Sequence, residues 1–337
     1  MNTGNVAMSF AIKQMIIRLL GVAVVTLSGL ACIACDSSNM GRTSGASNVR
    51  RTMDVSRTVE GERTSGLPWN RVRSWAYWLD NPDLKQLGAS PFDLLVIDSS
   101  ADGSAARAFT AQQIAALRRT APQRRVVAYL SIGQAESYRG YWQRGWRPGS
   151  PDWLGAQDSA WPGNYWVQYW QPAWQALIYR YLDAIIAAGF DGVYLDRVDA
   201  YQESYAAGHE EDMVQFVANL ARYARARAPL GEDFGIIVQN AEELAARHPD
   251  YVRIVTGIAR EEVYVRATDV PTSQAARAQA QSYLDLFLQS GKLVLTVDYA
   301  SRLELICSAY RLARAKGYVP YVTDVGLDRL RADPGCR

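Results

Sequence analysis

Polar residues, most of them carboxylic acids capable of acid–base chemistry, stand at the ends of the chain's short apolar runs. They are Asp98, Ser131, Asp196, Asn240, Asp298 and Asp324, with Glu261 just beyond the sixth run. If the run ends share one rim, several like charges meet there, which costs free energy unless a substrate, a cation or a shared proton relieves it. These residues, called the carboxylate ring below, are therefore a candidate site. The alternative for any single Asp is that it caps the helix that follows its strand.

Asp196 and Glu261 are the two acids best placed to work as a pair. Asp196 ends the run 191–196, shares its face with Tyr194 and precedes Arg197, whose charge can hold an acid ionised. Cleavage of a glycosidic bond needs two such groups, because one protonates the leaving oxygen while the other attacks the sugar or activates water. The stretch 257–262 supplies the second acid as Glu261, with Glu262 as the competing choice. Whichever of the two is not used is expected to be a solvated loop charge.

Composition argues against several other chemistries. His209 and His248 are the only histidines, which excludes sites built from three imidazoles, and both fall away from strand ends and are predicted to lie on the surface. The sequence contains no G-x-S-x-G, G-x-x-x-x-G-K-[ST] or G-x-G-x-x-G motif. Lys plus Arg number 36 against 34 for Asp plus Glu, so no basic field is present to hold nucleic acid. A metal-dependent hydrolase that uses the carboxylate ring stays an alternative. The small number of histidines counts against it.

Regular alternation of strands and helices predicts the α/β fold class. Eight apolar runs are predicted as strands, at 74–79, 92–98, 125–131, 191–196, 234–240, 254–258, 292–298 and 318–324. Stretches with helical apolar spacing lie between them, for example 174–188, 210–228, 272–290 and 303–316. Continuous apolar strands alternating with helices indicate a parallel sheet covered on both faces, and eight units indicate a single (β/α)₈ TIM-type barrel, with a doubly wound open sheet as the rival. The loops after the strands would then converge on one mouth.

One predicted loop is unusually long and aromatic. Between the third and fourth strands it has about 40 residues more than a barrel requires, and long loops in compact domains are usually functional. Flat aromatic faces suit sugar rings, although about half of these residues are expected to form a small satellite core. The aromatic residues are Tyr138, Tyr141, Trp142, Trp146, Trp153, Trp161, Tyr165, Trp166, Tyr169 and Trp170.

The N-terminal segment has the pattern of a targeting sequence. Lys13 and Arg18 precede a short apolar run that ends in small residues and cysteine, as in a secretory signal over 1–35. Cys35 is the predicted lipidation site of a surface lipoprotein, with Cys32 as the fallback and plain cleavage as the alternative. Residues 36–66 lack large apolar side chains and are predicted to be a tether, which leaves 67–337 as the barrel domain. In an oxidising compartment Cys307 and Cys336 either form a disulfide or stay free thiols.

The chain resembles the endo-α-1,4-polygalactosaminidase family, glycoside hydrolase family 114. The resemblance runs in order from about residue 72 to 330 and is carried by 127–133 (Val-Ala-Tyr-Leu-Ser-Ile-Gly), 161–167 (Trp-Pro-Gly-Asn-Tyr-Trp-Val), 190–201, Gln239-Asn240, Gly257-Ile258 with Glu261, and Val297-Asp298-Tyr299. It implies a (β/α)₈ barrel that hydrolyses galactosamine-containing exopolysaccharide without a cofactor. The family's aspartate after strand four matches Asp196, and its glutamate after strand six matches Glu261.

The resemblance also suggests which residues meet the polymer. The expected mechanism uses Asp196 as nucleophile or base and Glu261 as general acid, and the acids elsewhere on the ring would favour a cationic, partly deacetylated sugar. The family commonly has Gly-Glu-Ala-Glu where this chain has 133–136 as Gly-Gln-Ala-Glu, so Gln134 is not expected to take part in acid–base work. A non-catalytic glycan-binding lipoprotein is the alternative function, and membrane contact is expected only through the lipid anchor. The predicted substrate-binding residues are Asp98, Ser131, Glu136, Arg139, Asn164, Tyr165, Tyr194, Asp199, Asn240, Asp298 and Asp324.

Overall fold

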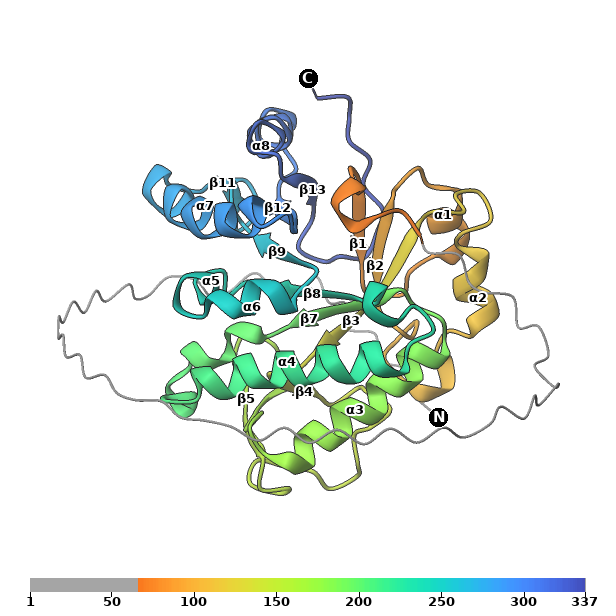
Figure 1. The fold of residues 1–337 in the computed structure, drawn as a ribbon, viewed down its shortest axis with the longest axis vertical. Helices are drawn as coiled ribbons and strands as arrows, with labels where there is room; N and C mark the ends of the chain where they lie inside the picture. Colours follow the sequence, from red (N-terminus) through yellow and green to blue (C-terminus); the bar gives the residue numbers. More distant parts are fainter. Residues whose placement is uncertain (1–65, 337) are drawn as a thin grey trace, which may run out of the picture. The chain divides into compact units, whose positions relative to one another are not determined.

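Eight apolar runs form one parallel sheet in the computed structural model, which describes residues 66–336. Neighbouring strands are parallel throughout. The first and last strands also lie against each other, where Trp75 Nε1 donates to the Val319 carbonyl at 3.0 Å. The sheet is thus nearly closed into a barrel, which confirms the predicted (β/α)₈ fold over the open sheet (Figure 1). In spatial order the strands are β1 (Trp75–Trp78), β2 (Leu94–Ile97), β3 (Arg125–Ser131), β7 (Gly192–Asp196), β8 (Gly235–Gln239), β9 (Gly257–Glu261), β12 (Leu293–Tyr299) and β13 (Val319–Thr323).

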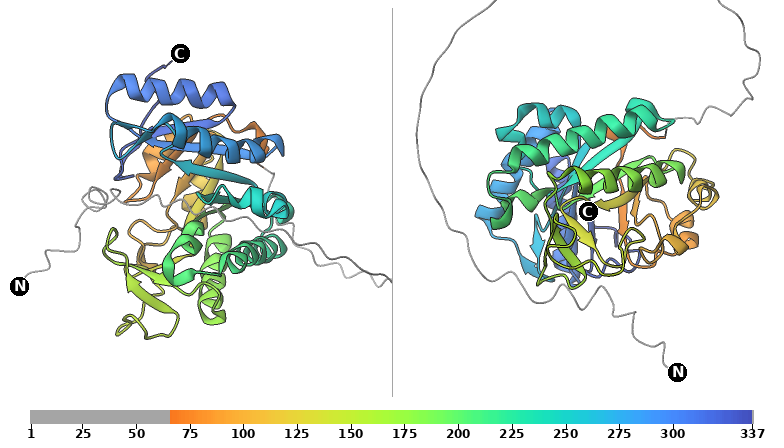
Figure 2. Two further views of the ribbon diagram at one scale, coloured as in Figure 1. Left: turned by 90° about the vertical axis from the view of Figure 1, so that its left-hand side faces the viewer. Right: turned by 90° about the horizontal axis from the view of Figure 1, so that it is seen from below.

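Helices lie outside the strands, as the two turned views show (Figure 2). Capping residues determine where several helices begin or end. Thr110 and Gln113 form a capping box at the start of one helix, and Ser273 caps the start of another. Gly317 ends a third helix with φ 81°. No helix of residues 66–336 is both long and apolar enough to cross a membrane. The helices are α1 (Leu84–Ala89), α2 (Ala111–Ala116), α3 (Pro172–Ala187), α4 (Glu210–Arg227), α5 (Leu244–Arg247), α6 (Pro249–Ile254), α7 (Gln274–Gln289) and α8 (Leu303–Lys316), with 3-10 turns at Trp69–Arg71, Ala105–Arg107, Val198–Gln202, Ser204–Ala206 and Gly231–Asp233.

The predicted position of the sixth strand was wrong. The apolar pair Ile254 and Val255 was assigned to it, but Ile254 closes α6, which Pro249 begins, and β9 runs from Gly257 to Glu261. Proline at the first helical position favours a helix there, and the two apolar residues belong to the packing of that helix end. Glu261 is therefore the last residue of a strand rather than a loop residue.

The aromatic insertion after β3 contains a sheet that the sequence pattern did not predict. Strands β4 (Gln134–Glu136), β5 (Leu154–Gln157) and β6 (Asn164–Val167) pair antiparallel in the order β4-β6-β5. Ring contacts at 5.0 to 5.3 Å link Trp142 to Trp146, Trp146 to Trp153, and Trp153 to the buried Trp174 of α3. Much of the aromatic content thus anchors the insertion to the barrel. A second small hairpin, β10 (Val265–Arg266) with β11 (Val270–Pro271), follows β9.

Stacked aromatic rings fill the barrel interior. Trp75 packs on Tyr77 at 5.8 Å and on Tyr321 at 5.7 Å, and Tyr77 packs on Tyr194 at 5.0 Å between ring centroids. These four side chains are buried. They make the barrel a packed core, and they leave the rim above them for polar groups.

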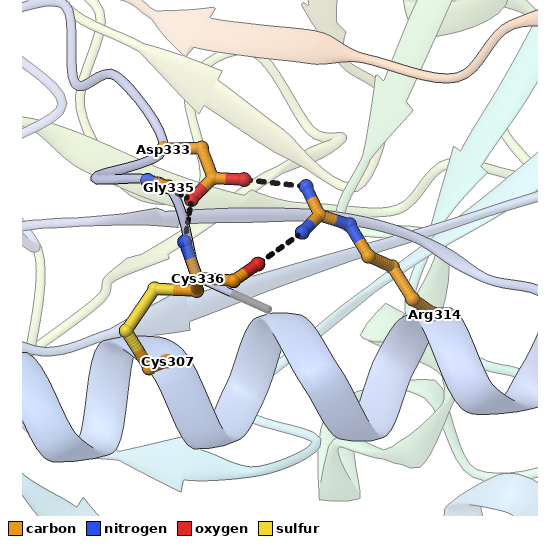
Figure 3. Close-up of a disulfide and its surroundings, with 5 residues drawn as sticks. All are labelled: Cys307, Arg314, Asp333, Gly335 and Cys336. Carbon is orange, nitrogen blue, oxygen red and sulfur yellow. Dashed lines mark hydrogen bonds and ion pairs between the residues drawn. A yellow bond between two sulfur atoms is a disulfide. The ribbon is translucent and has the colours of Figure 1, made fainter.

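A disulfide joins α8 to the C-terminal segment. Cys307 is bonded to Cys336, 29 residues later. Around it Arg314 donates to the Cys336 carbonyl at 3.0 Å and contacts the Asp333 carboxylate at 2.5 Å (Figure 3). The structure thus contains the pair rather than two free thiols, and it ties the end of the chain to the last helix.

Candidate active site

Three residues stand out in the eight-stranded sheet because they are not fully buried. They are Asp196 at the end of β7 and Arg260 with Glu261 at the end of β9. All three lie at the carboxyl ends of their strands, where the loops of a barrel form its mouth. Within the eight-stranded sheet the incompletely buried positions therefore include both acids paired from the sequence.

Asp196 lies at the mouth, and neighbouring residues on both sides influence its charge. It is level with Ser131 of β3, and its Oδ2 accepts a hydrogen bond from the Tyr129 hydroxyl at 2.7 Å. Burial raises the pKa of Asp196 to about 6, the charge of Arg197 opposes that rise, and the charge of Glu261 adds to it. An acid with this pKa is mostly ionised at neutral pH and still exchanges a proton easily.

Glu261 is fixed at both carboxylate oxygens. Its Oε2 accepts from Asn240 Nδ2 at 3.2 Å and its Oε1 accepts from the Tyr299 hydroxyl. Asn240 also accepts the Glu261 backbone N–H at 3.2 Å, so one amide side chain holds the residue at two points. Arg260 donates to Asn240 Oδ1 at 3.2 Å and to Glu242 at 2.8 Å, which completes the support.

The same backbone turn follows three neighbouring strands. Arg197 after β7, Asn240 after β8 and Glu262 after β9 have φ of 60°, 59° and 59°. Non-glycine residues in this left-handed region cost about 1 kcal/mol or more each, and they tend to gather at functional sites. Gly133 permits a close approach here, because a Cβ on it would lie 2.3 Å from the Arg197 carbonyl oxygen. The turns end the strands abruptly and leave Asp196 and Glu261 at the rim.

Asp196 and Glu261 lie at the ends of two strands that one other strand separates. One strand, β8, separates β7 from β9, so their backbones are about 10 Å apart, and inward side chains bring the carboxyl groups closer. Glu262 turns the other way: its Oε1 accepts the Ala267 N–H at 3.0 Å in the following loop. The competing choice thus organises a loop, and Glu261 is the acid that acts on Asp196.

Comparison with known proteins decides the family. A model of glycoside hydrolase family GH114 matches residues 57–335. The chain belongs to glycoside hydrolase family 114. This family 114 chain is 43% identical over 263 residues to an uncharacterized protein of Deinococcus radiodurans, covering 77% of this chain and 82% of the relative. It is 36% identical over 272 residues to one of Methanocaldococcus jannaschii, covering 76% and 77%.

Solved structures share the family 114 fold. The glycoside hydrolase domain of PelA from Pseudomonas aeruginosa gives a TM-score of 0.59 at 20% identity, covering 78% of this chain and 98% of that one. Ega3 of Aspergillus fumigatus, solved as a complex with galactosamine, gives 0.58 at 21% identity, covering 80% and 98%. The chain is a glycoside hydrolase, and a polysaccharide is its implied substrate.

Three residues predicted to bind substrate form a buried ion cluster in this family 114 barrel. Arg139 NH1 contacts both oxygens of Asp98 at 2.7 and 2.5 Å, and its Nε donates to Glu136 at 2.6 Å. Although burial alone would lower it, the carboxylates of Asp98 and Glu136 raise the pKa of Arg139. All three side chains are at most 7% exposed. The cluster reaches the rim through Tyr129, whose hydroxyl lies 3.4 Å from Glu136 and donates to Asp196 at 2.7 Å.

Two other predicted contacts, Asp298 and Asp324, have partners away from the acid pair. Asp298 is fully buried, burial raises its pKa to about 7, and it accepts the Tyr264 and Val265 N–H groups at 2.6 and 2.8 Å. Asp324 pairs with Arg331 at 2.9 Å on the surface. The structure does not bring these acids to the Asp196–Glu261 pair.

The remaining predicted contacts divide between the barrel core, the rim and the small sheet. Tyr194 is wholly inside the barrel core. Ser131 is buried next to Asp196 in register, and Asp199 lies close enough for its charge to raise the Asp196 pKa. Asn164 donates to Gln134 at 3.3 Å, and Tyr165 is half-buried against Trp142.

Gln134 belongs to a network that steadies the mouth. Its Nε2 donates to Asp158 Oδ2 at 2.7 Å, and Arg197 donates to the same oxygen at 3.1 Å. The Arg197 guanidinium also lies over the Trp166 ring at 5.2 Å. An amide at position 134 therefore supplies a donor where a glutamate would place a second negative charge beside Asp158.

Sequence reasoning missed two tyrosines that hydrogen-bond to Asp196 and Glu261. Tyr129 is on the same strand face as Ser131, and period-two alternation alone points it toward the mouth. Tyr299 was missed because the predicted strand ended at Asp298, one residue early, whereas β12 ends at Tyr299. Neighbours on a strand face opposite ways, so Asp298 supports the loop while Tyr299 reaches Glu261.

Both histidines are half-buried at helix ends, paired with carboxylates. His209 contacts Asp212 at 2.6 Å and stacks on Trp170 at 3.5 Å, and His248 contacts Glu210 at 2.8 Å. Within the described part of the chain, His, Cys, Asp and Glu side chains form no group of three suited to a metal ion. The predicted targeting residues Lys13, Arg18, Cys32 and Cys35 and most of the tether lie outside the described residues.

Proposed function

We propose that this enzyme hydrolyses α-1,4-linked, galactosamine-containing exopolysaccharide, with Asp196 as nucleophile or base and Glu261 as general acid. The observation that carries the proposal is the placement of these acids as the accessible carboxyl groups of the eight strands, close enough for the charge of Glu261 to raise the pKa of Asp196. Since that pKa is about 6, Asp196 is mostly ionised at pH 7, as a nucleophile or base must be.

The charges at the mouth favour a cationic amino sugar. Asp196 and Asp199 lie there, whereas the neighbouring Arg197 and Arg260 are paired with Asp158 at 3.1 Å and Glu242 at 2.8 Å. A partly deacetylated galactosamine polymer carries ammonium groups that this field attracts. The structural neighbour Ega3, solved with galactosamine, supports the same sugar class. This substrate preference rests on the mouth itself, because Asp98, Asp298 and Asp324 are engaged elsewhere.

The test is release of reducing ends from α-1,4-linked galactosamine polymers that differ only in acetylation. We expect oligosaccharide products from the partly deacetylated polymer and a rate at least severalfold lower on the fully acetylated one, because the latter lacks ammonium groups. An α-1,4-linked galactose polymer is the neutral control. Equal rates on all three would contradict the charge-based preference, and no cleavage of either amino-sugar polymer would overturn the substrate assignment.

We also propose that the enzyme is exported and lipid-anchored through Cys35. The basic and apolar pattern before Cys35 supports export, and so does the Cys307–Cys336 disulfide, because disulfides persist in oxidising compartments. Labelled palmitate is expected to be incorporated into the full-length chain in cells and lost in Cys35→Ser. Retained label in Cys35→Ser with loss in Cys32→Ser would move the anchor, and absence of label in the parent would leave plain cleavage.

A further inference from the structure

A cavity is lined by residues that include neither Asp196 nor Glu261. It has a volume of about 640 Å³, which is within the range of about 300 to 1,000 Å³ typical of ligand sites. Its walls come from the loop after β2, the loop after β4 and the outer part of α3. The cluster of Arg139, Asp98 and Glu136 lies next to its wall, because the hydroxyl of Tyr181 in that wall accepts a hydrogen bond from Arg139 and forms another with Ser99. The cavity is thus a site of its own.

The lining combines flat apolar surface with hydrogen-bonding groups. Tyr141 and Trp142 contribute aromatic surface, and small residues on the facing loop and on α3 leave the space open. Ser99 and the Tyr181 hydroxyl, 2.9 Å apart, place two hydroxyl groups on the wall. Aromatic surface next to hydroxyl groups is suited to a sugar ring, which has an apolar face and a polar edge.

The charge of the cavity is opposite to that of the mouth. Arg180 is the one ionisable side chain with a full charge among the residues that line it, and no Asp or Glu does so. Among residues 66–336 the Arg180 side chain has neither an ion pair nor a hydrogen bond, so its guanidinium is available to a ligand. A guanidinium matches a carboxylate with two parallel hydrogen bonds and repels an ammonium group.

We propose that this cavity binds a saccharide of one or two rings that carries a carboxylate, with Arg180 as its anion contact. The site is therefore expected to reject the amino sugar that the mouth favours. The proposal uses the cavity's own residues and does not depend on which polymer is cut at the mouth.

A hydrogen-bonded path joins the cavity wall to the catalytic acid. The Tyr181 hydroxyl is 3.3 Å from Arg139, whose Nε is 2.6 Å from Glu136, and Glu136 is 3.4 Å from the Tyr129 hydroxyl, which donates to Asp196 at 2.7 Å. A ligand that moves Tyr181 would act on this path.

The test is calorimetric titration with three disaccharides of the same α-1,4 linkage, namely digalacturonate, digalactose and digalactosamine. We expect digalacturonate to bind at least about tenfold more tightly than digalactose, and Arg180→Gln to remove that difference. Ala184→Phe, which fills the cavity from the exposed face of α3, is expected to abolish binding of digalacturonate. Arg222→Gln on the exposed face of α4 is the matched control and should bind as the parent does.

Two outcomes would overturn the proposal: no binding of digalacturonate to the parent, or binding that survives both Arg180→Gln and Ala184→Phe. Polymer cleavage by these variants should stay within about twofold of the parent, which also shows that they are folded. Failure of the parent to cut galactosamine polymers would contradict the proposed function alone, because the titration is read independently of cleavage.

Discussion

Asp196→Asn and Glu261→Gln are each expected to lower kcat/KM on the polymer by about 10² to 10⁴, the range for removing a positioned acid or base, or more if Asp196 is the nucleophile. Both amides keep the size of the side chain, so Tyr129, Asn240 and Tyr299 keep most of their packing. Initial rates of reducing-end release measure the effect, and unchanged melting temperatures show that the variants are folded. The reason is that neither amide can attack, accept a proton or donate one in the reaction.

A substrate with a good leaving group separates the two roles. A glycosyl fluoride needs no protonation of the leaving atom, so Glu261→Gln is expected to recover most of its rate on it, while Asp196→Asn stays inactive. In the parent, kcat/KM should fall as the pH drops through about 6, because protonation of Asp196 removes the nucleophile or base. Recovery in Asp196→Asn instead of Glu261→Gln would reverse the assignment.

Glu262→Gln is the matched control for this experiment. It changes the neighbouring glutamate in the same way, but that side chain accepts the Ala267 N–H in the following loop. We expect its activity to stay within about threefold of the parent, below the smallest effect of removing a positioned acid or base. A loss in Glu262→Gln as large as in Glu261→Gln would contradict the choice between the two acids.

Strand periodicity predicted the barrel and the acid pair because both depend on short-range patterns. Continuous apolar runs ending in polar residues placed Asp196 at the rim, and the two helices 210–228 and 303–316 were within one residue of α4 and α8. The β4-β6-β5 sheet escaped prediction because strands of three or four residues pair across gaps of up to about 30 residues, and such pairing leaves little local signal. Pairing between distant segments depends on the whole fold, so no short stretch of sequence predicts it.

The hydrogen-bond and ion-pair partners of the strand-ending acids come from distant parts of the sequence, and their positions could not be predicted from it. Asp98 and Asp196 look alike as strand-ending acids, yet Asp98 meets Arg139, 41 residues away, and Asp196 does not. A single buried arginine therefore holds Asp98 in an ion cluster, whereas Asp196 stays accessible at the end of its strand. Asp298 is also held, because its oxygen is taken by two backbone N–H groups of the loop after β9.

Arg139→Met is expected to destabilise the fold by about 3 to 5 kcal/mol, the usual cost of removing one partner from a buried ion pair. The methionine fills much of the same space but leaves Asp98 and Glu136, 5% and 1% exposed, as two carboxylates without a cation. Urea unfolding at pH 7.5 measures the free energy of unfolding. Because uncompensated burial raises carboxylate pKa values in the folded state, that loss should shrink as the pH falls and the two acids become protonated.

Two further variants separate the lost charge from lost packing at this cluster. Arg253→Met removes a surface arginine whose partner Asp250 is equally exposed, and it should cost less than about 1 kcal/mol. Adding Asp98→Asn and Glu136→Gln to Arg139→Met removes the unpaired charges, so most of the lost stability should return if charge is the cause. If the triple variant is no more stable than Arg139→Met, packing of the guanidinium against the Tyr138 ring, 5.2 Å away, would be the larger contribution, and the cluster's electrostatic role would be contradicted.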